Sequence, residues 1–359
     1  VRPALRRGAL PMNLQVTPFS LRLKKPIQTA RGPMDERVGF RVSFTADGIT
    51  GRGDAMPMAS FGTETPEAAL AALQRFDLAT APTTVEEVAV AIDQLSSTPA
   101  ARHAVECALL EHVAIRKGVL VATLLGPVLR SHFAVNALLE GDDAAGLAAS
   151  AERAVQQGFR VVKLKVAARP LSIEAQRLLA VRRAVGPDVH IRIDANGGWS
   201  EATARSALRG LDALGLEVCE QPVGSHDVEG LRRLRHMAPC RIAADETMLL
   251  SGVLPRLLEK DPRAAADVIV LKPAALGGLV RSLQLAQQAH AAGMSAYVTT
   301  LMDGPIARAA AAHLAAVLPA ADWAHGLSTV ELFEGMQPDP CTPMGGEITL
   351  PQATGWGVP

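Results

Sequence analysis

The chain has 359 residues and a mass of 37.7 kDa, with 36 lysine and arginine residues against 36 aspartate and glutamate residues. Hydrophobic residues make up 48% of the chain and charged residues 20%, which is enough apolar material for a large core and too little charge for a disordered chain. The balanced charge excludes binding of nucleic acid or acidic membranes through net charge, so we expect neither as a partner.

The cysteine usage and the N-terminus bear on the cellular compartment. Four cysteines lie far apart in the sequence, with no Cys-x-x-Cys pair and no histidine at zinc-site spacing, so we predict neither a disulfide framework nor a structural zinc site. Residues 1–11 are basic but contain no apolar run suited to a signal peptide, and no stretch reaches the roughly 20 apolar residues of a membrane span. We therefore expect a cytoplasmic protein.

The first hundred or so residues predict a mixed α+β domain. Alternating apolar residues on either side of the Asp47-Gly48 turn predict two strands, and helical apolar spacing predicts three helices. The expected strands cover 38–44 and 49–52, and the expected helices cover 66–76, 85–95 and 100–117.

From residue 132 onward, short β-rich runs alternate with amphipathic stretches, each of which we expect to be a helix of about ten or more residues. This alternation predicts an α/β fold with a parallel sheet, and its unbroken course favours a closed β/α barrel over an open doubly wound sheet. Residues 326–359 are rich in glycine and proline, and we expect them to pack back on the first domain. The seven expected strands are 133–139, 161–166, 190–194, 217–220, 241–245, 268–272 and 295–299.

Charged residues end five successive strands of this series. They are spaced about 25 to 30 residues apart, which is one β/α unit each, and catalytic groups of β/α barrels converge where the strands end. We therefore expect one site that contains Lys163, Lys165, Asp194, Glu220, Asp245 and Lys272. Taken singly, a Lys-x-Lys is typical of a solvated strand and Asp194-Ala195-Asn196 of a turn, so the prediction depends on the whole series.

The composition of this expected site indicates its chemistry. Asp194, Glu220 and Asp245 would repel one another unless a cation lay among them, and an oxygen-only set of ligands suits a hard ion such as Mg²⁺, with Mn²⁺ as an alternative. Lys163 and Lys165 are two residues apart on one strand, so their side chains share a face. A lysine that is partly desolvated near a cation has a lowered pKa and can act as a general base.

With this series, the sequence resembles the enolase superfamily in its muconate lactonizing enzyme subgroup, whose members have Lys-x-Lys, Asp, Glu, Asp and Lys at the ends of successive barrel strands. Residues 51–57 are similar to the G-x-G-E-A-x-P segment of the capping domain, with Asp54 in place of the usual Glu, and Asp303 stands where many relatives have Glu. Residues 134–139, 271–278 and 324–329 are similar to o-succinylbenzoate synthases.

The resemblance implies a (β/α)7β barrel, a modified TIM barrel, over residues 129–325. An α+β capping domain over 1–128 would cover its mouth, and residues 326–359 would pack on that domain. It also implies that Mg²⁺ on the three carboxylates stabilises the enediolate formed when a proton α to a carboxylate is removed from a small-molecule substrate.

In the synthase reaction, a lyase reaction of menaquinone biosynthesis, the resemblance implies that Lys165 takes this proton and then helps the β-hydroxyl leave as water. Lys272 would stabilise the intermediate from the opposite face, Lys163 would support Lys165, and Asn196 and Glu246 would orient the ligands. An N-acylamino acid racemase, a dipeptide epimerase and a muconate cycloisomerase remain alternatives, although the Asp-x-Asp usual in dipeptide epimerases is not found after Thr300. A non-catalytic barrel that binds a metal or a carboxylate is disfavoured, because the lysines on both sides of the site, Lys165 and Lys272, and all three carboxylates are present. The substrate's distal group and the oligomeric state stay open.

Overall fold

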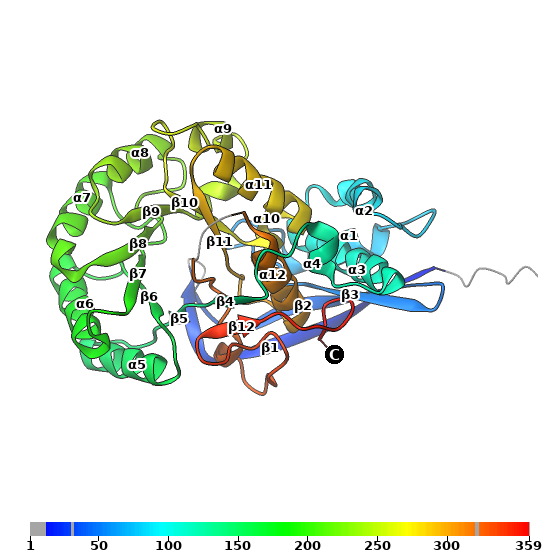
Figure 1. The fold of residues 1–359 in the computed structure, drawn as a ribbon, viewed down its shortest axis with the longest axis horizontal. Coiled ribbons are helices and arrows are strands. Elements are labelled where there is room, and N and C mark those ends of the chain that lie inside the picture. The colour runs from blue at the N-terminus through cyan, green and yellow to red at the C-terminus, as the bar shows by residue number, and fades with distance from the viewer. Residues whose placement is uncertain (1–11, 30–31, 320–322, 359) are drawn as a thin grey trace, which may run out of the picture.

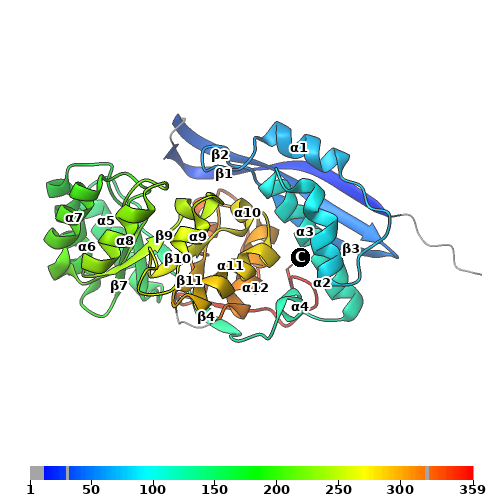
Figure 2. The same cartoon turned by 90° about the horizontal axis from the view of Figure 1, so that it is seen from above.

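The computed structural model describes residues 12–29, 32–319 and 323–358, so the basic stretch over residues 1–11 lies outside the described residues. Two larger sheets organise the chain: an antiparallel sheet with its helices, which we call the cap, and a curled parallel sheet with helices on its outer side (Figure 1). The long strands β1 and β2 run from the cap toward the parallel sheet (Figure 2). Among the described residues, no helix is both long and apolar enough to cross a membrane.

The cap is built on an antiparallel sheet with the strand order β1-β2-β3. Both strands predicted from the sequence are confirmed, and the turn between them has Asp47 and Gly48 at positive φ, the conformation of a tight two-residue hairpin. The sequence analysis missed β1. The elements are β1 (Asn13–Thr29), β2 (Gly32–Ala46), β3 (Ile49–Ala55), α1 (Pro66–Arg75), α2 (Val85–Ala91), the 3-10 helix η1 (Ile92–Leu95), α3 (Pro99–Lys117) and α4 (Val121–Leu125).

Helix α3 packs directly on β3, and two glycines permit this close approach. A Cβ atom at Gly51 would lie 2.0 Å from the Ala108 carbonyl oxygen, and one at Gly53 would lie 1.9 Å from the Ala104 carbonyl oxygen. Both distances are far below van der Waals contact, so any larger residue would force the strand and the helix apart. The glycines of the segment 51–57 are therefore required by packing inside the cap.

The parallel sheet has the strand order β11-β10-β9-β8-β7-β6-β5. Six of the seven strands expected from the sequence are found within one or two residues of their predicted bounds. The expected strand 133–139 is wrong as a single element, because it divides into β4, which pairs with β12, and β5, which joins the parallel sheet. The strands are β4 (His132–Ala134), β5 (Ala137–Leu138), β6 (Val161–Lys165), β7 (His190–Asp194), β8 (Leu216–Glu220), β9 (Arg241–Ala244), β10 (Val268–Leu271) and β11 (Ser295–Val298).

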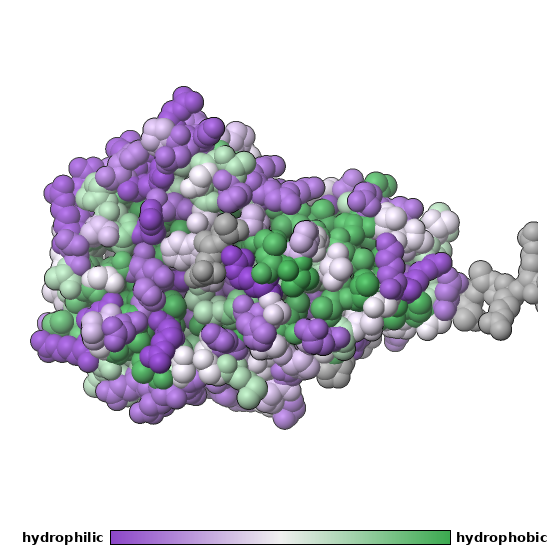
Figure 3. Space-filling view, in the orientation of Figure 1, coloured by the Kyte–Doolittle hydropathy of each residue, from purple (hydrophilic) through white to green (hydrophobic). Residues whose placement is uncertain are grey.

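Most helices that follow these strands are long. Figure 3 shows that the outer surface is largely hydrophilic where α6 to α8 lie. The expectation of a long helix after every strand is wrong after β9, where Gly252 and Pro262 interrupt the segment and only short helices form. The helices are α5 (Ala144–Gln156), α6 (Leu171–Val185), α7 (Glu201–Gly210), η2 (Asp212–Leu214), α8 (Val228–Met237), η3 (Glu246–Leu249), α9 (Leu254–Leu257), α10 (Pro273–Leu276), α11 (Leu279–Ala291) and α12 (Pro305–Val317).

The two edges of the parallel sheet are linked by a short segment near the C-terminus. His325 forms a parallel bridge with Val135, and Gly326 forms one with Thr299 just beyond β11. The segment thus lies between the two edges in the position of an eighth strand. The mixed α/β class with a curled parallel sheet is confirmed, and the complete (β/α)7β barrel stays a prediction.

Residues after 326 form η4 (Val330–Leu332) and β12 (Glu347–Thr349) and then return to the cap. The Trp356 indole N–H donates to the Arg52 carbonyl oxygen (3.1 Å), and the Arg52 guanidinium donates to the Val358 carbonyl oxygen (2.9 Å). On α12, His313 accepts from the Ala122 backbone N–H at Nδ1 (3.0 Å) and donates from Nε2 to the Trp356 carbonyl oxygen (3.0 Å). The C-terminal segment therefore contacts both the cap and a helix of the parallel sheet, while the domain boundaries at 128 and 325 stay predictions.

Replacing Gly53 by alanine tests the contact between β3 and α3. We expect Gly53→Ala to lower the free energy of unfolding by roughly 1–3 kcal/mol or more, because the added methyl group overlaps the Ala104 carbonyl. The measurement is urea denaturation followed by circular dichroism. The control is Gly210→Ala in α7, where nothing lies within 4 Å of the new Cβ atom and alanine should stabilise the helix by up to about 1 kcal/mol. Equal stability of the two variants would contradict the packing argument.

His313 makes the stability of the fold depend on pH. Burial lowers the pKa of His313 to about 4, whereas an unfolded histidine titrates near 6.5. The unfolded chain therefore binds the proton more tightly than the folded protein does. The contribution of neutral His313 to the free energy of unfolding is complete above about pH 6.5 and is lost as the pH falls toward 4. We expect protonation of this histidine alone to lower the free energy of unfolding by about 2 kcal/mol at pH 5, relative to neutral pH.

The measurement is the difference in unfolding free energy between pH 7.5 and pH 5, for wild type and His313→Asn. The variant should show a smaller difference, whereas the control His236→Asn, at an exposed position on α8, should match wild type. An unchanged pH dependence in His313→Asn would refute this assignment.

Candidate active site

The register of the parallel sheet brings the predicted site residues together. Lys165, Asp194 and Glu220 are paired across β6, β7 and β8, so they lie side by side where these strands end. Asp245 directly follows β9 and Lys272 directly follows β10, so they continue the same row. Because the strands are parallel, every one of these charges comes to the same edge of the sheet.

Lys163 is held between two carboxylates of this row. Its ammonium nitrogen lies 2.7 Å from both carboxylate oxygens of Glu220 and 3.0 Å from Oδ2 of Asp194. Burial opposes the positive charge, but the two carboxylates outweigh it and raise the pKa of Lys163. Lys163 is therefore held as a cation.

Lys272 is buried on the other side of the row. It forms an ion pair with Asp245, and its ammonium nitrogen lies 4.2 Å from the centre of the Phe61 ring, which belongs to the segment that follows β3 in the cap. Burial again opposes the charge, and Asp245 more than compensates and raises the pKa of Lys272. A ring face above a desolvated ammonium adds a favourable cation–π contact and keeps water away from it.

Lys165 differs from the other two lysines. Its side chain is exposed at the end of β6, and it forms no hydrogen bond or ion pair with any residue that the structure describes. It stands opposite Asp194 in the sheet register. Of the three lysines predicted at the site, Lys165 alone can therefore reach an incoming molecule without first breaking a contact within the protein.

The three carboxylates are almost completely buried, with exposed fractions of 3% for Asp194, 1% for Glu220 and 2% for Asp245. Burial opposes the charge of Asp194, but Lys163 outweighs it and lowers the pKa of Asp194 to about 2. Burial raises the pKa of Glu220 to about 7 and that of Asp245 to about 6, and repulsion from neighbouring carboxylates adds to both. The cations of Lys163 and Lys272 lower these two pKa values in part but do not offset the effect of burial.

The donor set fits a hard divalent ion. It consists only of carboxylate oxygens, which Mg²⁺ and Mn²⁺ prefer, and a cation would relieve the repulsion that raises the pKa of Glu220 and Asp245. Within the described residues, however, no three His, Cys, Asp or Glu side chains are already arranged to hold a metal ion. Lys163 and Lys272 instead neutralise the carboxylates, so binding of an ion requires these side chains to rearrange.

Backbone turns after the strands orient the carboxylates. Asn196 adopts a positive φ of 43°, its backbone N–H donates to Oδ1 of Asp194 (3.0 Å), and its side-chain amide donates to Glu246 (3.1 Å). The structure thus brings together Asn196 and Glu246, which were expected to orient the site.

Gln221 is a site residue that the sequence analysis missed. It is fully buried, and its amide oxygen accepts the backbone N–H groups of Asp245 (2.9 Å) and Thr247 (3.2 Å), which ties the end of β8 to the end of β9. Its amide group also donates to the Val223 carbonyl oxygen (2.8 Å). Gln221 therefore sets the position of Asp245 relative to Glu220, and only its place directly after Glu220 hinted at such a role.

The sequence analysis also missed two residues beneath the carboxylates. The Tyr297 hydroxyl, from β11, donates to Oε2 of Glu220, and the Arg192 guanidinium, from β7, lies 4.9 Å from the centre of the Tyr297 ring. The available signals were a charged residue between the two isoleucines of β7 and the single tyrosine of the chain. Neither signal says which residue lies across the sheet.

The cap approaches the same edge of the sheet through further polar contacts. Asp303, whose role the sequence left open, is buried beside Arg37 of β2, and burial raises the pKa of Asp303 to about 6 although Arg37 opposes this shift. Arg37 in turn donates to the carbonyl oxygens of Met56 (2.7 Å) and Pro57 (2.9 Å). Asp54 accepts the Ile306 backbone N–H at the start of α12 (2.9 Å).

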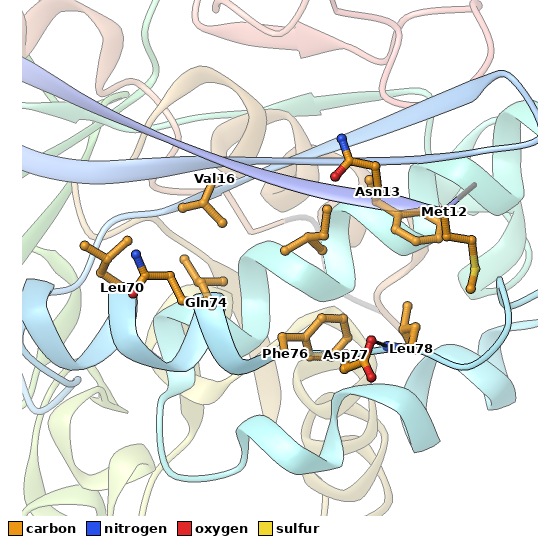
Figure 4. A pocket seen from close by; sticks show the side chains of 11 residues that line it. Met12, Asn13, Val16, Leu70, Gln74, Phe76, Asp77 and Leu78 are labelled. Atoms are coloured by element: carbon orange, nitrogen blue, oxygen red, sulfur yellow. Dashed lines mark hydrogen bonds between the residues drawn. The ribbon is translucent and has the colours of Figure 1, made fainter. Parts of the chain in front are cut away.

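A cavity of about 520 Å³ lies elsewhere, between α1 and the sheet of the cap (Figure 4). Most of the residues that line it are apolar, and Asp77 is the charged residue among them. No residue of the row of lysines and carboxylates borders this cavity. The density of charged groups, and not the size of this cavity, therefore marks the candidate active site.

Two family descriptions match the sequence. Residues 12–126 match the mandelate racemase / muconate lactonizing enzyme N-terminal domain, and residues 146–359 match the enolase C-terminal domain-like family. The chain belongs to the enolase superfamily, in its muconate lactonizing enzyme subgroup. The family resemblance inferred from the strand-end residues is thus confirmed, and the finer likeness to o-succinylbenzoate synthases stays a prediction.

The relatives of this chain differ from one another in their activities. Muconate cycloisomerase 1-1 of Acinetobacter lwoffii is 31% identical over 327 residues, covering 88% of this chain and 84% of that protein. The L-Ala-D/L-Glu epimerase of Bacillus subtilis, solved with substrate, superposes with a TM-score of 0.89 at 26% identity, covering 96% of this chain and 98% of that chain. A dipeptide epimerase of Enterococcus faecalis, solved with Mg and the dipeptide L-Leu-L-Tyr, gives 0.87 at 25% identity, with the same coverage. This enolase superfamily enzyme thus has relatives with different reactions.

Proposed function

We propose that this enzyme removes a proton α to a carboxylate of a small-molecule substrate, with Lys165 as the general base. The observation that carries the proposal is the difference between the lysines. Lys165 is exposed and forms no hydrogen bond or ion pair with a described residue, whereas the partly buried Lys163 and the buried Lys272 are held in ion pairs. In this proposal Asp194, Glu220 and Asp245 hold Mg²⁺ or Mn²⁺. When bound, such an ion supplies the positive charge that stabilises an enediolate.

The protein's own groups divide the remaining work. Lys165 accepts the α-proton at Nζ, and Lys163, two residues earlier on the same strand face, keeps positive charge close to the substrate carboxylate. Lys272 acts as a fixed cation on the far side of the site. The Phe61 ring shields Lys272 from water, which strengthens its interaction with developing negative charge.

The specific reaction that we propose is syn elimination of water, as in o-succinylbenzoate synthase, a lyase of menaquinone biosynthesis. The α C–H bond breaks and its proton moves to Lys165; the electron pair then forms a C=C bond as the β C–O bond breaks. The leaving hydroxide takes the proton back from Lys165 and departs as water. One free lysine suffices for both steps, which agrees with the exposure of only Lys165 among the three described lysines of the site. The synthase-like stretches of the sequence add support.

Epimerisation or racemisation is the second candidate. It needs a base that removes the α-proton from one face of the substrate and an acid that delivers a proton to the other face. Lys165 on β6 and Lys272 after β10 belong to non-adjacent strand ends. The two epimerase structures at 25% and 26% identity favour it, and the cycloisomerase relatives favour a related isomerisation. The ion pair of Lys272 with Asp245 disfavours proton delivery from that side.

We also propose that the cap, residues 1–128, closes over a (β/α)7β barrel of residues 129–325. The contacts of Phe61 with Lys272, of Arg37 with the Met302 carbonyl oxygen and of Asp54 with α12 support this arrangement. Each of these joins the cap to a segment that follows β10 or β11. Specificity would then depend on residues of both parts.

Substitution of the two lysines tests the proposed reaction. Lys165→Ala should lower turnover of the cyclohexadiene precursor of o-succinylbenzoate at least about 1,000-fold, because base and acid are lost together. Lys272→Arg keeps the charge but gives up a proton far less readily, so it should retain measurable dehydration. The measurement is the loss of ultraviolet absorbance of the cyclohexadiene, with α-proton exchange of N-succinyl amino acids in deuterated water followed in parallel.

The outcomes separate the candidates. Dehydration that survives in Lys272→Arg but not in Lys165→Ala supports the one-base reaction. If wild type exchanges and inverts amino-acid substrates while it leaves the cyclohexadiene unchanged, the synthase assignment is wrong and epimerisation replaces it. Unimpaired turnover in Lys165→Ala would remove the proposed base for both reactions.

Metal binding gives a separate test of the carboxylates. We expect Asp245→Asn to weaken Mn²⁺ binding at least about 10-fold, because one of three charged ligands is lost. Calorimetric titration of chelator-treated protein measures the affinity without substrate. Asp212→Asn, which changes an exposed carboxylate on η2, is the control and should bind as wild type does. Full activity of metal-free wild type would contradict the proposed metal site.

A further inference from the structure

A polar chain crosses the apolar interior of the parallel sheet beneath the candidate active site. Its members are Glu217, Arg192, Tyr297 and Glu220, which lie on the three strands β7, β8 and β11. The surrounding buried side chains are apolar, and Trp323 packs against them. These apolar neighbours of the chain are Val218, Ala243, Val268 and Val270.

Tyr297 reaches Glu220 across the interior of the curled sheet. Strands β9 and β10 separate β11 from β8 in the strand order, so this contact does not come from neighbouring strands. Tyr297 is 1% exposed, and its hydroxyl donates to Oε2 of Glu220. A phenylalanine would fill the same apolar space, so the hydroxyl adds only the bond to this carboxylate.

Arg192 fixes the ring of Tyr297 in turn. Its guanidinium lies 4.9 Å from the centre of the Tyr297 ring and 5.4 Å from that of the Trp323 ring. It also donates to the Glu217 carboxylate and to the Ala324 carbonyl oxygen (2.7 Å), so its charge and its position are both held. The tyrosine therefore presents its hydroxyl in one direction.

Lys163 alone leaves the orientation of the Glu220 carboxylate undetermined. Its ammonium group lies 2.7 Å from both carboxylate oxygens, so it holds the charge of Glu220 without distinguishing Oε1 from Oε2. The Tyr297 hydroxyl contacts Oε2 only. This second donor therefore determines how the carboxylate plane is turned.

We infer that Tyr297 is a positioning residue for the metal ligand Glu220, and that Arg192, which lies over the Tyr297 ring, holds this ring in place. The inference rests on the proposed function, in which Glu220 is a ligand of a divalent ion. With Tyr297 in place the carboxylate stays in one orientation and keeps lone pairs available for the ion, as residues that hydrogen-bond to metal ligands do. Without the hydroxyl, the carboxylate must be ordered each time an ion binds.

The first experiment measures Mn²⁺ affinity of substrate-free, chelator-treated protein by electron paramagnetic resonance. Tyr297→Phe keeps the ring and its contact with Arg192 and removes one oxygen atom, so we expect the Kd for Mn²⁺ to rise about 10-fold or more. The control is Ser282→Ala, which removes another fully buried hydroxyl and its bond to the Gly278 carbonyl oxygen (2.6 Å) in α11. This control should bind Mn²⁺ as wild type does.

The second experiment needs no substitution of Tyr297. The chain contains a single tyrosine, so protein labelled with 3-fluorotyrosine gives one ¹⁹F resonance, which reports on Tyr297 directly. We expect this resonance to shift when Glu220→Gln replaces the carboxylate acceptor by an amide, and to shift on addition of Mg²⁺ to the otherwise unsubstituted protein. At a Mg²⁺ concentration that only just saturates the wild type, the Mg²⁺-induced shift should be smaller in Asp245→Asn.

The outcomes distinguish this inference from the proposed function. If wild type binds Mn²⁺ and Tyr297→Phe binds it within about two-fold, the inference is wrong and the metal site stands. If wild type binds neither Mn²⁺ nor Mg²⁺, the proposed metal site and the inference both fail. Should Tyr297→Phe not fold, the ¹⁹F resonance decides, and a resonance that neither Glu220→Gln nor Mg²⁺ moves would overturn the role of Tyr297.

Discussion

The buried charges at the edge of the parallel sheet compensate one another across strands. Removing a carboxylate or an ammonium group from water costs several kcal/mol unless an opposite charge and hydrogen bonds replace the lost hydration. Lys163 on β6 lies between carboxylates from β7 and β8, and Lys272 after β10 lies against the carboxylate after β9. These ion pairs therefore join different strands. A shift of one strand by one residue would turn its charge to the other face and leave its partner uncompensated.

The cap is attached to the same part of the sheet by carboxylates that accept backbone N–H groups at helix starts. Asp54 accepts from Ile306 at the start of α12, and Glu106 of α3 accepts from Leu279 and Val280 at the start of α11. Helix starts carry free N–H groups and partial positive charge, so these are favourable contacts. Because α11 and α12 follow β10 and β11, they connect the cap to the strand that Lys272 follows and to the strand that contains Tyr297.

Environment gives three chemically identical lysines different properties. Lys163 is partly buried and Lys272 is buried, both against carboxylates, whereas Lys165 ends its strand at the surface. Lys163 and Lys165 share a strand face, so the difference between them comes from their depth along β6 and from their neighbours on β7 and β8. Lys163 and Lys272 can thus serve as fixed cations while Lys165, in the same cluster, stays free of ion pairs with described residues.

Local patterns in the sequence determined a large part of this protein. Strand β7 has the bounds that its apolar run predicted, and α3 begins one residue before its predicted start. The regular spacing of charged residues also placed the carboxylates and lysines at one edge, because parallel strands of similar length end together. Strand β1 was missed because it is an edge strand, partly exposed and containing Pro18 and Pro26, so its apolar alternation is weak.

Only the tertiary structure decided which groups touch across the interior. The contact of Tyr297 with Glu220 depends on how far the sheet curls, and the burial of Lys272 beneath Phe61 depends on how the cap sits. The division of residues 133–139 between two sheets likewise follows from pairing with β12, more than 200 residues later in the chain. Periodicity describes neighbours along one helix or strand, whereas these contacts join segments far apart in the sequence, so no local pattern could specify them.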